Sequence, residues 1–305
     1  MRSTFGWERT TLTKDAWGFA ALHRIAGCVP ASRSLAFAAG LLLSGSAYAL
    51  PDGIGHPEPG QIGLQVPESP VAHELNFFHN GILLPLITLI CLFVLVLLAI
   101  VVVKFNERAN PVPARTTHHA LLEVAWTVVP VLILVAIAVP SFRLLNHQLI
   151  LPDGDMTLKV TGKQWYWSYE YPKDQGGISF DSIIKPENEL KPGDLRLLAV
   201  DNEVVVPVNK IIRLQITSAD VIHSFVIQSF SVRMDAVPGR LNEAWFKAER
   251  EGLYYGQCSK LCGKDHAFMP IAFRVVSQDK YDAWLADKKK SAALASQTRV
   301  ADAAR

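Results

Sequence analysis

Two cysteines, a histidine and a methionine lie within twelve residues near the C-terminal end of the sequence: Cys258, Cys262, His266 and Met269. Thiolate, imidazole and thioether groups together form the soft ligand set that suits copper in electron-transfer sites. A second imidazole would complete the ligands of two metal ions. His223, which follows a strand-like segment, is the best candidate for it. The pattern favours a copper site for electron transfer.

Three other interpretations of the two cysteines remain open at this point. Cys258 and Cys262 could form a disulfide, which an exported compartment permits. They could bind structural zinc together with histidines, or they could be unrelated residues of a core. The methionine argues against zinc, and the density of histidine and methionine argues against a plain disulfide, so copper remains favoured.

Two uncharged, apolar runs precede this region, Gly81–Val103 with 23 residues and Val124–Phe142 with 19 residues. At about 1.5 Å per residue, a helix over the longer run is roughly 35 Å long, which is enough to cross a bilayer. The loop between the runs carries Lys104, Arg108 and Arg115 against Glu107, with Glu123 directly before the second run, whereas residues 50–80 carry no Lys or Arg. Because short basic loops stay in the cytoplasm, we predict a transmembrane helical hairpin over residues 81–143 with both ends outside.

The first 49 residues have the features of an export signal. A basic segment precedes the apolar stretch Leu35–Leu43, and Ala47-Tyr48-Ala49 fits an A-x-A cleavage site. We therefore predict a signal peptide over residues 1–49. An exported, extended N-terminal tail with five prolines follows over residues 50–80. An organellar presequence is the alternative, but the compact apolar region favours bacterial export.

Short apolar or alternating segments, separated by turn residues, predict an all-β sandwich or barrel over residues 151–278. A C-terminal helix and tail should occupy residues 279–305. The chain is 50% hydrophobic, only 19% charged and has a net charge of +2, which excludes disorder and gives no case for nucleic-acid binding. The expected strands are Met156–Thr161, Gln164–Tyr171, Leu195–Val200, Lys210–Thr217, Ser224–Ile227 and Ile271–Val276.

Four motifs in this order resemble subunit II of haem–copper cytochrome c oxidases. They are the aromatic run Gln164–Tyr171, the segment Asp235-Ala-Val-Pro-Gly-Arg240, Tyr254-Tyr255-Gly256-Gln257, and the Cys258–Met269 loop. With the tail and the hairpin, the resemblance covers nearly all of the chain that follows the signal peptide. It implies an all-β cupredoxin-like Greek-key sandwich preceded by a two-helix transmembrane hairpin.

The resemblance also implies a function and a place in the cell. The chain would be a redox subunit of cytochrome c oxidase, in the bacterial inner membrane with its C-terminal domain in the periplasm. It would accept electrons from cytochrome c and pass them to subunit I, where oxygen reduction is coupled to proton translocation. Its partners would be subunit I, other oxidase subunits, cytochrome c and membrane lipid. A copper chaperone is the alternative function, and it would need neither Trp165 nor Glu123.

By the same resemblance, two copper ions would form a CuA centre in which the two cysteine thiolates bridge the metals. His223 and His266 would each bind one copper ion, Met269 would be a weak ligand, and the backbone carbonyl of Lys260 would complete the set. The family usually has glutamate at position 260, where its side chain helps to bind Mg²⁺. A lysine ammonium is not an oxygen ligand, so the resemblance leaves a magnesium site in doubt here.

Outside the copper loop, the resemblance makes Trp165 the point where electrons enter and Glu123 the entrance of a proton path. From pattern alone, Trp165 would be a core aromatic and Glu123 an interfacial carboxylate. Residues 151–278 hold fifteen basic and sixteen acidic residues, so no strongly attractive field is expected for a lysine-ringed partner. The acids that match the family's docking positions for cytochrome c are Glu170, Asp181, Asp201 and Asp220.

Overall fold

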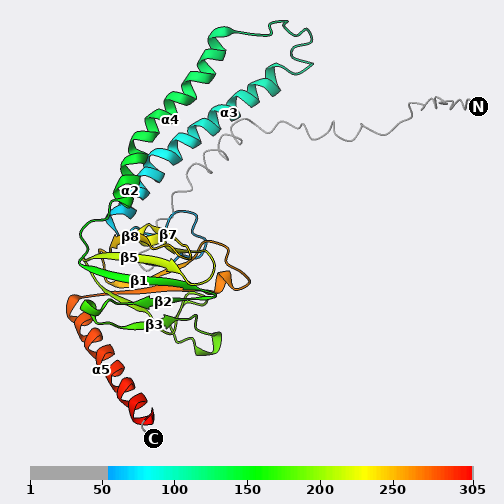
Figure 1. Cartoon of the computed structure of the whole chain (residues 1–305). Helices are drawn as coiled ribbons and strands as arrows, with labels where there is room; N and C mark the ends of the chain where they lie inside the picture. The colour runs from blue at the N-terminus through cyan, green and yellow to red at the C-terminus, as the bar shows by residue number, and fades with distance from the viewer. Residues whose placement is uncertain (1–53, 304–305) are drawn as a thin grey trace, which may run out of the picture. The chain divides into compact units, whose positions relative to one another are not determined.

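The computed structural model describes residues 54–303, with their side chains as far as residue 291 (Figure 1). The predicted signal peptide lies outside the described residues. Two long apolar helices are followed by a β-sandwich and then by a C-terminal helix, α5 (Gln278–Ala303). The sandwich after a helical hairpin confirms the predicted fold class.

The first long helix runs without a break from Pro70 to Lys104, over 35 residues, as α2 (Pro70–Phe77), a π-helical turn η1 (Phe78–Leu83) and α3 (Leu84–Lys104). The second is α4 (Ala120–Leu149), with 30 residues. Both are long and apolar enough to cross a membrane, and the apolar stretch of each is exposed in the isolated chain. The helices begin before the uncharged runs because their N-caps, Ser69 and His119, lie ahead of those runs. At its other end, α4 continues beyond Phe142 to Leu149. The segment expected to be an extended tail is therefore helical from Pro70 onward.

The exported domain consists of two five-stranded sheets. Figure 1 shows β1, β2, β3 and β5 of the first sheet side by side. The first sheet has the order β3 (Ser179–Ser182), β2 (Tyr166–Glu170), β1 (Met156–Lys163), β5 (Ile211–Ser218) and β8 (Asn242–Lys247). The second has the order β4 (Val204–Pro207), β10 (Pro270–Val276), β9 (Gly252–Cys258), β6 (His223–Ile227) and β7 (Val232–Ala236). The pairs β1–β5 and β4–β10 are parallel, and the other paired strands are antiparallel.

The two sheets enclose a core in which aromatic rings contact one another. Trp167 and Phe225 meet edge to face with centroids 5.3 Å apart, and Phe225 meets Phe273 at 6.0 Å. Phe230 stacks on Phe246 at 4.5 Å. All five side chains are at most 1% exposed. Such close packing makes the scaffold beneath the Cys258–Met269 loop stiff.

One expected strand is wrong. Leu195–Val200 forms hydrogen-bonded turns, in which Leu198 and Ala199 both donate to the carbonyl of Leu195. Leu197 adopts a positive φ of 68°, and only Val200 makes an isolated β-bridge. The apolar residues of this segment therefore cover one end of β9 as a loop. The pattern also failed to predict β3, β4, β7, β8 and β9, of which β3, β7 and β8 have mixed polar and apolar sequences.

Residues 54–69, before the first helix, pack onto the sandwich. The backbone N–H of Tyr255 donates to the carbonyl of Gly55 at 2.7 Å, and the Ser69 hydroxyl donates to the carbonyl of Phe230 at 2.8 Å. Glu68 is only 2% exposed and forms a two-pronged ion pair with Arg250. The segment thus fixes the start of the hairpin to the exported domain.

We expect Arg250→Ala to lower the free energy of unfolding by about 3 kcal/mol, because it leaves the buried Glu68 carboxylate without its cation. The matched control is Arg196→Ala. Arg196 pairs with Glu187 at the surface, so its loss should cost less than about 0.5 kcal/mol. Urea unfolding of the detergent-solubilised chain, followed by tryptophan fluorescence, measures both. Equal effects of the two variants would show that the Glu68 pair does not stabilise the domain.

Candidate metal centre

The predicted metal ligands come from two neighbouring strands and one loop. His223 begins β6, and Cys258 ends β9, the strand with which β6 pairs. Cys262 lies in the loop after β9, His266 begins the short 3₁₀ helix η5 (His266–Phe268), and Met269 directly precedes β10. The pairing of Phe225 with Cys258 fixes the register, so His223 lies beside the first thiol.

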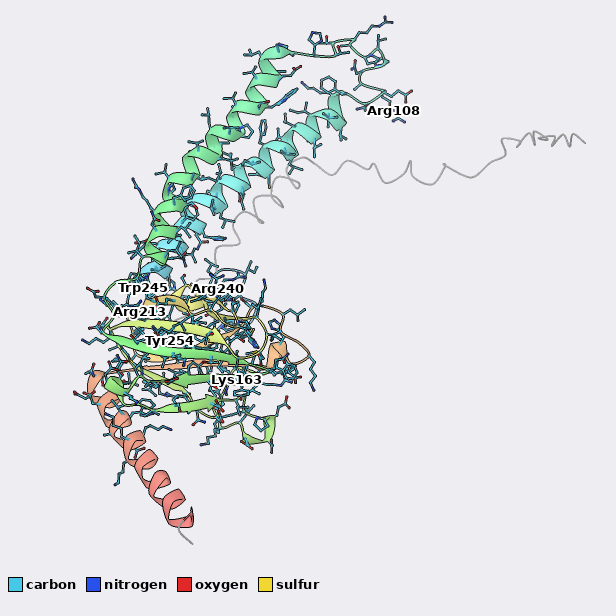
Figure 2. All side chains as sticks on the ribbon, in the orientation of Figure 1. Arg108, Lys163, Arg213, Arg240, Trp245 and Tyr254 are labelled. Atoms are coloured by element: carbon cyan, nitrogen blue, oxygen red, sulfur yellow. The ribbon has the colours of Figure 1, made fainter. Side chains whose placement is uncertain are left out.

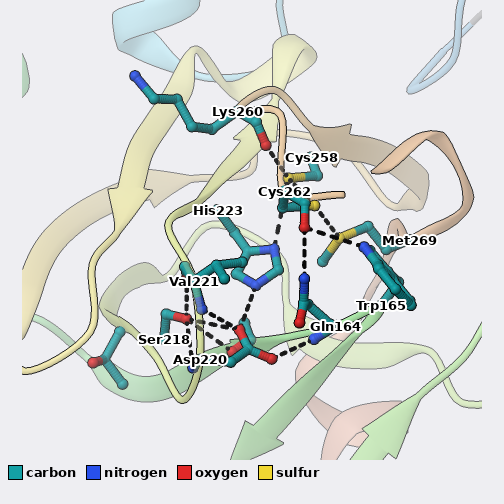
Figure 3. Close-up of polar contacts among 12 residues, drawn as sticks. Gln164, Trp165, Ser218, Asp220, Val221, His223, Cys258, Lys260, Cys262 and Met269 are labelled. Atoms are coloured by element: carbon teal, nitrogen blue, oxygen red, sulfur yellow. Dashed lines mark hydrogen bonds and ion pairs between the residues drawn. The ribbon is translucent and has the colours of Figure 1, made fainter. Parts of the chain in front are cut away.

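The structure brings the donor atoms of all these residues together, and Figure 3 shows His223, Cys258, Cys262 and Met269 among them. The two cysteine Sγ atoms are 3.9 Å apart. His223 Nδ1 is 4.0 Å from Cys258 Sγ, and His266 Nδ1 is 3.6 Å from Cys262 Sγ. Met269 Sδ is 3.5 Å from Cys262 Sγ. The carbonyl oxygen of Lys260 is 3.3 Å from Cys258 Sγ.

These separations fit a metal and not a disulfide. Donors at about 2.0–2.3 Å from a tetrahedral metal lie roughly 3.3–3.8 Å from each other, close to the distances found here. A disulfide needs sulfur atoms about 2.05 Å apart, and both cysteines are free. The ligand atoms of His223, Cys258 and Cys262 all lie within 4.8 Å of one another, and the three residues are buried. With a thioether beside the thiols, the donor set is soft and suits copper better than zinc.

Without a metal, the two thiols differ sharply in acidity. Burial opposes ionisation of Cys258, but hydrogen bonds with the His223 imidazole and the backbone at Ser224 outweigh it and lower its pKa to about 7. Burial, followed by the adjacent Cys258 thiol, raises the pKa of Cys262 to about 12. The Cys258 thiolate therefore forms readily near neutral pH, and its charge opposes ionisation of the Cys262 thiol. A cation bound between them would favour both sulfurs as thiolates, so metal binding at neutral pH releases protons.

The back of the His223 ring is held by a carboxylate. Its Nε2 lies 2.9 Å from Asp220 Oδ1, which directs Nδ1 toward the thiols. Burial raises the pKa of Asp220, but hydrogen bonds from His223 and from the backbone N–H groups of Val221 and Gln164 outweigh it and lower the pKa. A carboxylate that stays ionised here makes the imidazole a stronger ligand.

Gln164 links the two halves of the site. Its backbone N–H donates to Asp220 at 2.6 Å, and its side-chain amide donates to the carbonyl of Cys262 at 2.8 Å. One residue thus joins the arm that carries His223 to the loop that carries the cysteines. The sequence pattern did not identify Gln164 as a functional residue, because its partners lie 56 and 98 residues away.

Two tryptophans of the aromatic run also contact the copper loop. Trp165 donates from Nε1 to the carbonyl of Cys262 at 3.3 Å, and its ring lies so close to Gly263 that a Cβ there would be 2.8 Å from it. The fully buried Trp167 donates to the carbonyl of Met269 at 3.1 Å. Trp167 therefore fixes the position of the methionine backbone.

Known proteins match the chain along most of its length. The family of the cytochrome c oxidase subunit II periplasmic domain matches residues 156–276, and that of the subunit II transmembrane domain matches residues 57–144. A probable cytochrome c oxidase subunit 2 of Rickettsia bellii is 51% identical over 245 residues, covering 80% of this chain and 90% of the relative. The cytochrome c oxidase subunit 2 of Cereibacter sphaeroides is 47% identical over 269 residues, covering 81% and 88%. The chain belongs to the cytochrome c oxidase subunit II family.

Among solved structures, the periplasmic domain of subunit II of cytochrome oxidase from Bradyrhizobium japonicum is 57% identical. The match covers 47% of this chain and 99% of that one, with a TM-score of 0.43. Family membership confirms that the chain is a redox subunit of an oxidase complex with other subunits. It confirms an inner-membrane protein whose C-terminal domain lies in the periplasm. A copper centre fits both the family and the donor set of this subunit II chain.

The side chain of Lys260 points away from the thiols, as Figure 3 shows. It is exposed, and only its backbone carbonyl faces the site. The departure from the usual glutamate of subunit II therefore leaves the donor cluster intact.

Glu123 lies in the first turn of α4, apart from the metal ligands, and is exposed in the isolated chain. Its carboxylate accepts a hydrogen bond at 3.3 Å from the backbone N–H of His119, the N-cap residue. In the subunit alone, this residue caps a helix, as a carboxylate in a first turn often does.

Two of the predicted docking acids, Glu170 and Asp181, lie on the neighbouring strands β2 and β3. Each is already close to a lysine of its own chain, Glu170 to Lys159 at 3.0 Å and Asp181 to Lys163 at 3.8 Å. Both acids remain accessible, but their charges are partly compensated.

The other two docking acids bind backbone N–H groups. Asp201 accepts hydrogen bonds from Ile183 and Asn202, both at 2.7 Å. Asp220 is engaged by His223, as described above. Of the four acids, Asp220 therefore has a defined structural task in the metal centre.

We expect Gly162→Ala to weaken copper binding, because its Cβ would lie 2.9 Å from Cδ2 of His223 and force the imidazole out of place. The overpacking should also cost about 1–3 kcal/mol of folding free energy. The control is Gly63→Ala, since nothing lies within 4 Å of a Cβ at that position. Copper titration and urea unfolding of each variant measure the two effects. Normal copper affinity in Gly162→Ala would contradict this account of how His223 is held.

Proposed function

We propose that this subunit binds two copper ions in a CuA centre, accepts electrons from cytochrome c there and passes them to subunit I. The observation that supports it best is the convergence of five side-chain donors, two of which are free, adjacent thiols. Cys258 and Cys262 would bridge the metals, and His223 and His266 would each bind one of them. Met269 and the carbonyl of Lys260 would complete the set. When bound, such a thiolate-bridged pair exchanges one electron with little change in ligand geometry.

The residues of the chain contribute position and charge. Asp220 orients His223, Gln164 joins the two ligand-bearing arms, and Trp167 holds the backbone at Met269. Because these contacts exist in the protein itself, the donors need little rearrangement when copper binds.

Trp165 is the proposed point where electrons enter. Its indole is part-buried and is hydrogen-bonded to the backbone of a ligand, Cys262, so a short path joins its ring to the metal centre. The ammonium of Lys264 lies 5.6 Å from the ring centroid. A lysine-ringed cytochrome c would meet this cation near the contact point. We therefore propose that short-range contact at Trp165 matters more than long-range attraction by Glu170, Asp181, Asp201 and Asp220.

Magnesium is not among the cofactors that we propose. Lys260 offers no side-chain oxygen at the position where the family usually has a glutamate, and its ammonium points away from the thiols.

The first prediction concerns the copper ligands. The wild-type subunit should hold two copper ions per chain, with an EPR spectrum in which one electron is shared by two equivalent copper nuclei. Cys258→Ser and Cys262→Ser should each abolish the shared signal, whereas Cys91→Ser, which alters a thiol in α3, should leave it intact. Copper analysis and EPR of the purified protein decide this. One bound copper, or zinc in its place, would overturn the two-copper centre.

A second prediction separates electron transfer from metal binding. Trp165→Phe removes the hydrogen bond to Cys262 but keeps an aromatic ring, so copper content should stay normal. We expect electron transfer from cytochrome c to slow by roughly tenfold or more, equivalent to about 1.4 kcal/mol of barrier. Trp284→Phe, at the α5 contact with Tyr171, is the control. Stopped-flow reduction of the centre measures the rate, and an unchanged rate would make Trp165 a packing residue.

We also propose Glu123 as the entrance of a proton path into subunit I. Glu123→Gln keeps an oxygen that can accept from the His119 backbone, so the helix cap should survive. Proton uptake coupled to oxygen reduction should fall, while reduction of the copper centre stays normal. Time-resolved uptake with a pH dye in the assembled oxidase is the measurement. If uptake is unaltered, Glu123 only caps the helix.

A further inference from the structure

A cavity of about 580 Å³ lies where α2 and α4 meet the sandwich, away from the metal ligands. Its wall is mainly apolar, with Val71 and Leu75 from α2, and Leu145 and Leu149 from α4. Met234 and Trp245 contribute from β7 and β8. The volume is typical of sites that take small molecules or part of a lipid.

The height of the cavity follows from the two apolar runs. Leu75 precedes Gly81 by six residues, and Leu145 and Leu149 follow Phe142 by three and seven. At 1.5 Å per residue these positions are roughly 5–10 Å beyond the apolar runs. The headgroup region on each side of a bilayer is about 5–8 Å thick. The cavity therefore lies at the level of the lipid headgroups on the periplasmic side.

Two polar groups of the wall lack partners among the described residues. The indole N–H of Trp245 is buried without a hydrogen-bond acceptor. Arg233, exposed on β7, forms neither an ion pair nor a hydrogen bond within the part of the chain that the structure describes. Figure 2 shows Trp245 at the end of the sandwich nearest the helices. A buried donor without an acceptor costs free energy, so a ligand oxygen here would be stabilising.

Two ion pairs lie close to the cavity. His147 lies 3.0 Å from Glu74, and its ring packs against Trp245 with centroids 5.5 Å apart. Glu243, next to the wall residue Ala244, is bound by Arg213 at 2.7 Å. Among the described residues that line the cavity, Arg233 is the one with a charged side chain, which favours an anionic ligand.

We propose that this cavity binds the glycerol-phosphate end of an anionic phospholipid of the outer leaflet. The phosphate would lie at Arg233, and an ester oxygen would accept from the Trp245 indole. The first methylenes of the acyl chains would pack against the leucines of α2 and α4, and the chains would continue down into the bilayer. The parts of the lipid and the elements of the cavity wall follow the same order. The phosphate and esters would meet β7 and β8, away from the membrane, and the acyl chains would follow α2 and α4 into the membrane. An indole at the interface is a common partner of lipid esters. The proposal is independent of copper and of the electron path.

Lipid retention by the purified oxidase complex tests the phosphate contact. After exchange into detergent, native mass spectrometry of complexes titrated with phosphatidylglycerol or phosphatidylcholine gives the affinity for each lipid. We expect phosphatidylglycerol to bind more tightly, and Arg233→Gln to weaken it about tenfold. The control is Arg196→Gln. Arg196 is exposed and does not line the cavity, so the affinity for phosphatidylglycerol should stay unchanged. Equal retention of the two lipids, or an equal affinity in both variants, would overturn the proposal.

A second measurement keeps the test independent of how well the variants assemble. Phosphatidylglycerol brominated near its ester end should quench tryptophan fluorescence of the wild-type complex in nanodiscs. The quenched fraction should be smaller in Trp245→Phe. Quenching that is identical in the two proteins would contradict a lipid at Trp245. So would a structure of the assembled oxidase in which side chains of another subunit fill the cavity.

Discussion

The metal centre depends on one backbone pairing, the antiparallel contact between β6 and β9. In this register Phe225 faces Cys258, and residues two apart on a strand point to the same side, so His223 arrives beside the thiol. The histidine and the first cysteine are 35 residues apart in sequence, yet their distance is set by strand hydrogen bonds and not by a flexible loop. The buried aromatic residues beneath both strands keep that distance from varying. A site prepared in this way loses little conformational entropy when a metal binds.

Around this pairing, hydrogen bonds join groups that have different tasks. Asp220 holds the imidazole, Gln164 holds both Asp220 and the carbonyl of Cys262, and Trp165 reaches the same carbonyl. The backbone carbonyl of Cys262 therefore accepts hydrogen bonds from two residues with different roles. Gln164 helps to hold the metal ligands, and Trp165 is the proposed entry point of electrons. A change at Asp220 or Gln164 should therefore disturb the ligands, whereas Trp165 can lose its hydrogen bond to this carbonyl without displacing a donor side chain. Small glycines, such as Gly162 beneath His223, make the close approach possible.

The sequence allowed prediction of the helical hairpin and of the donor residues, which depend on local pattern. The hairpin followed from two uncharged runs, and the donor residues followed from their spacing within one loop and one strand start. Elements held by distant partners were not predictable in this way. Leu195–Val200 looks like a strand, but its apolar residues cover β9 from a turn. The strands β7 and β8 mix polar and apolar residues without a regular pattern, and their pairing with β6 and β5 makes them strands. Gln164 and Trp167 acquire their tasks only through contacts with residues 56 to 102 positions away in the sequence.

Charge compensation within the domain bears on how a redox partner can approach. Of the predicted docking acids, Glu170 and Asp181 lie close to lysines of the same sheet, and Asp201 accepts hydrogen bonds from backbone N–H groups. The ammonium of Lys264 lies 5.6 Å from the centroid of the Trp165 ring. Long-range attraction falls off within about 10 Å in physiological salt, and partly cancelled charges have even less reach. The surface thus offers little steering but does offer a ring that is bonded directly to the ligand loop. A partner that touches this ring in any of several orientations would be equally close to the metal centre. In such an arrangement the rate of electron transfer depends on contact at one residue, and a weak, short-lived complex is sufficient.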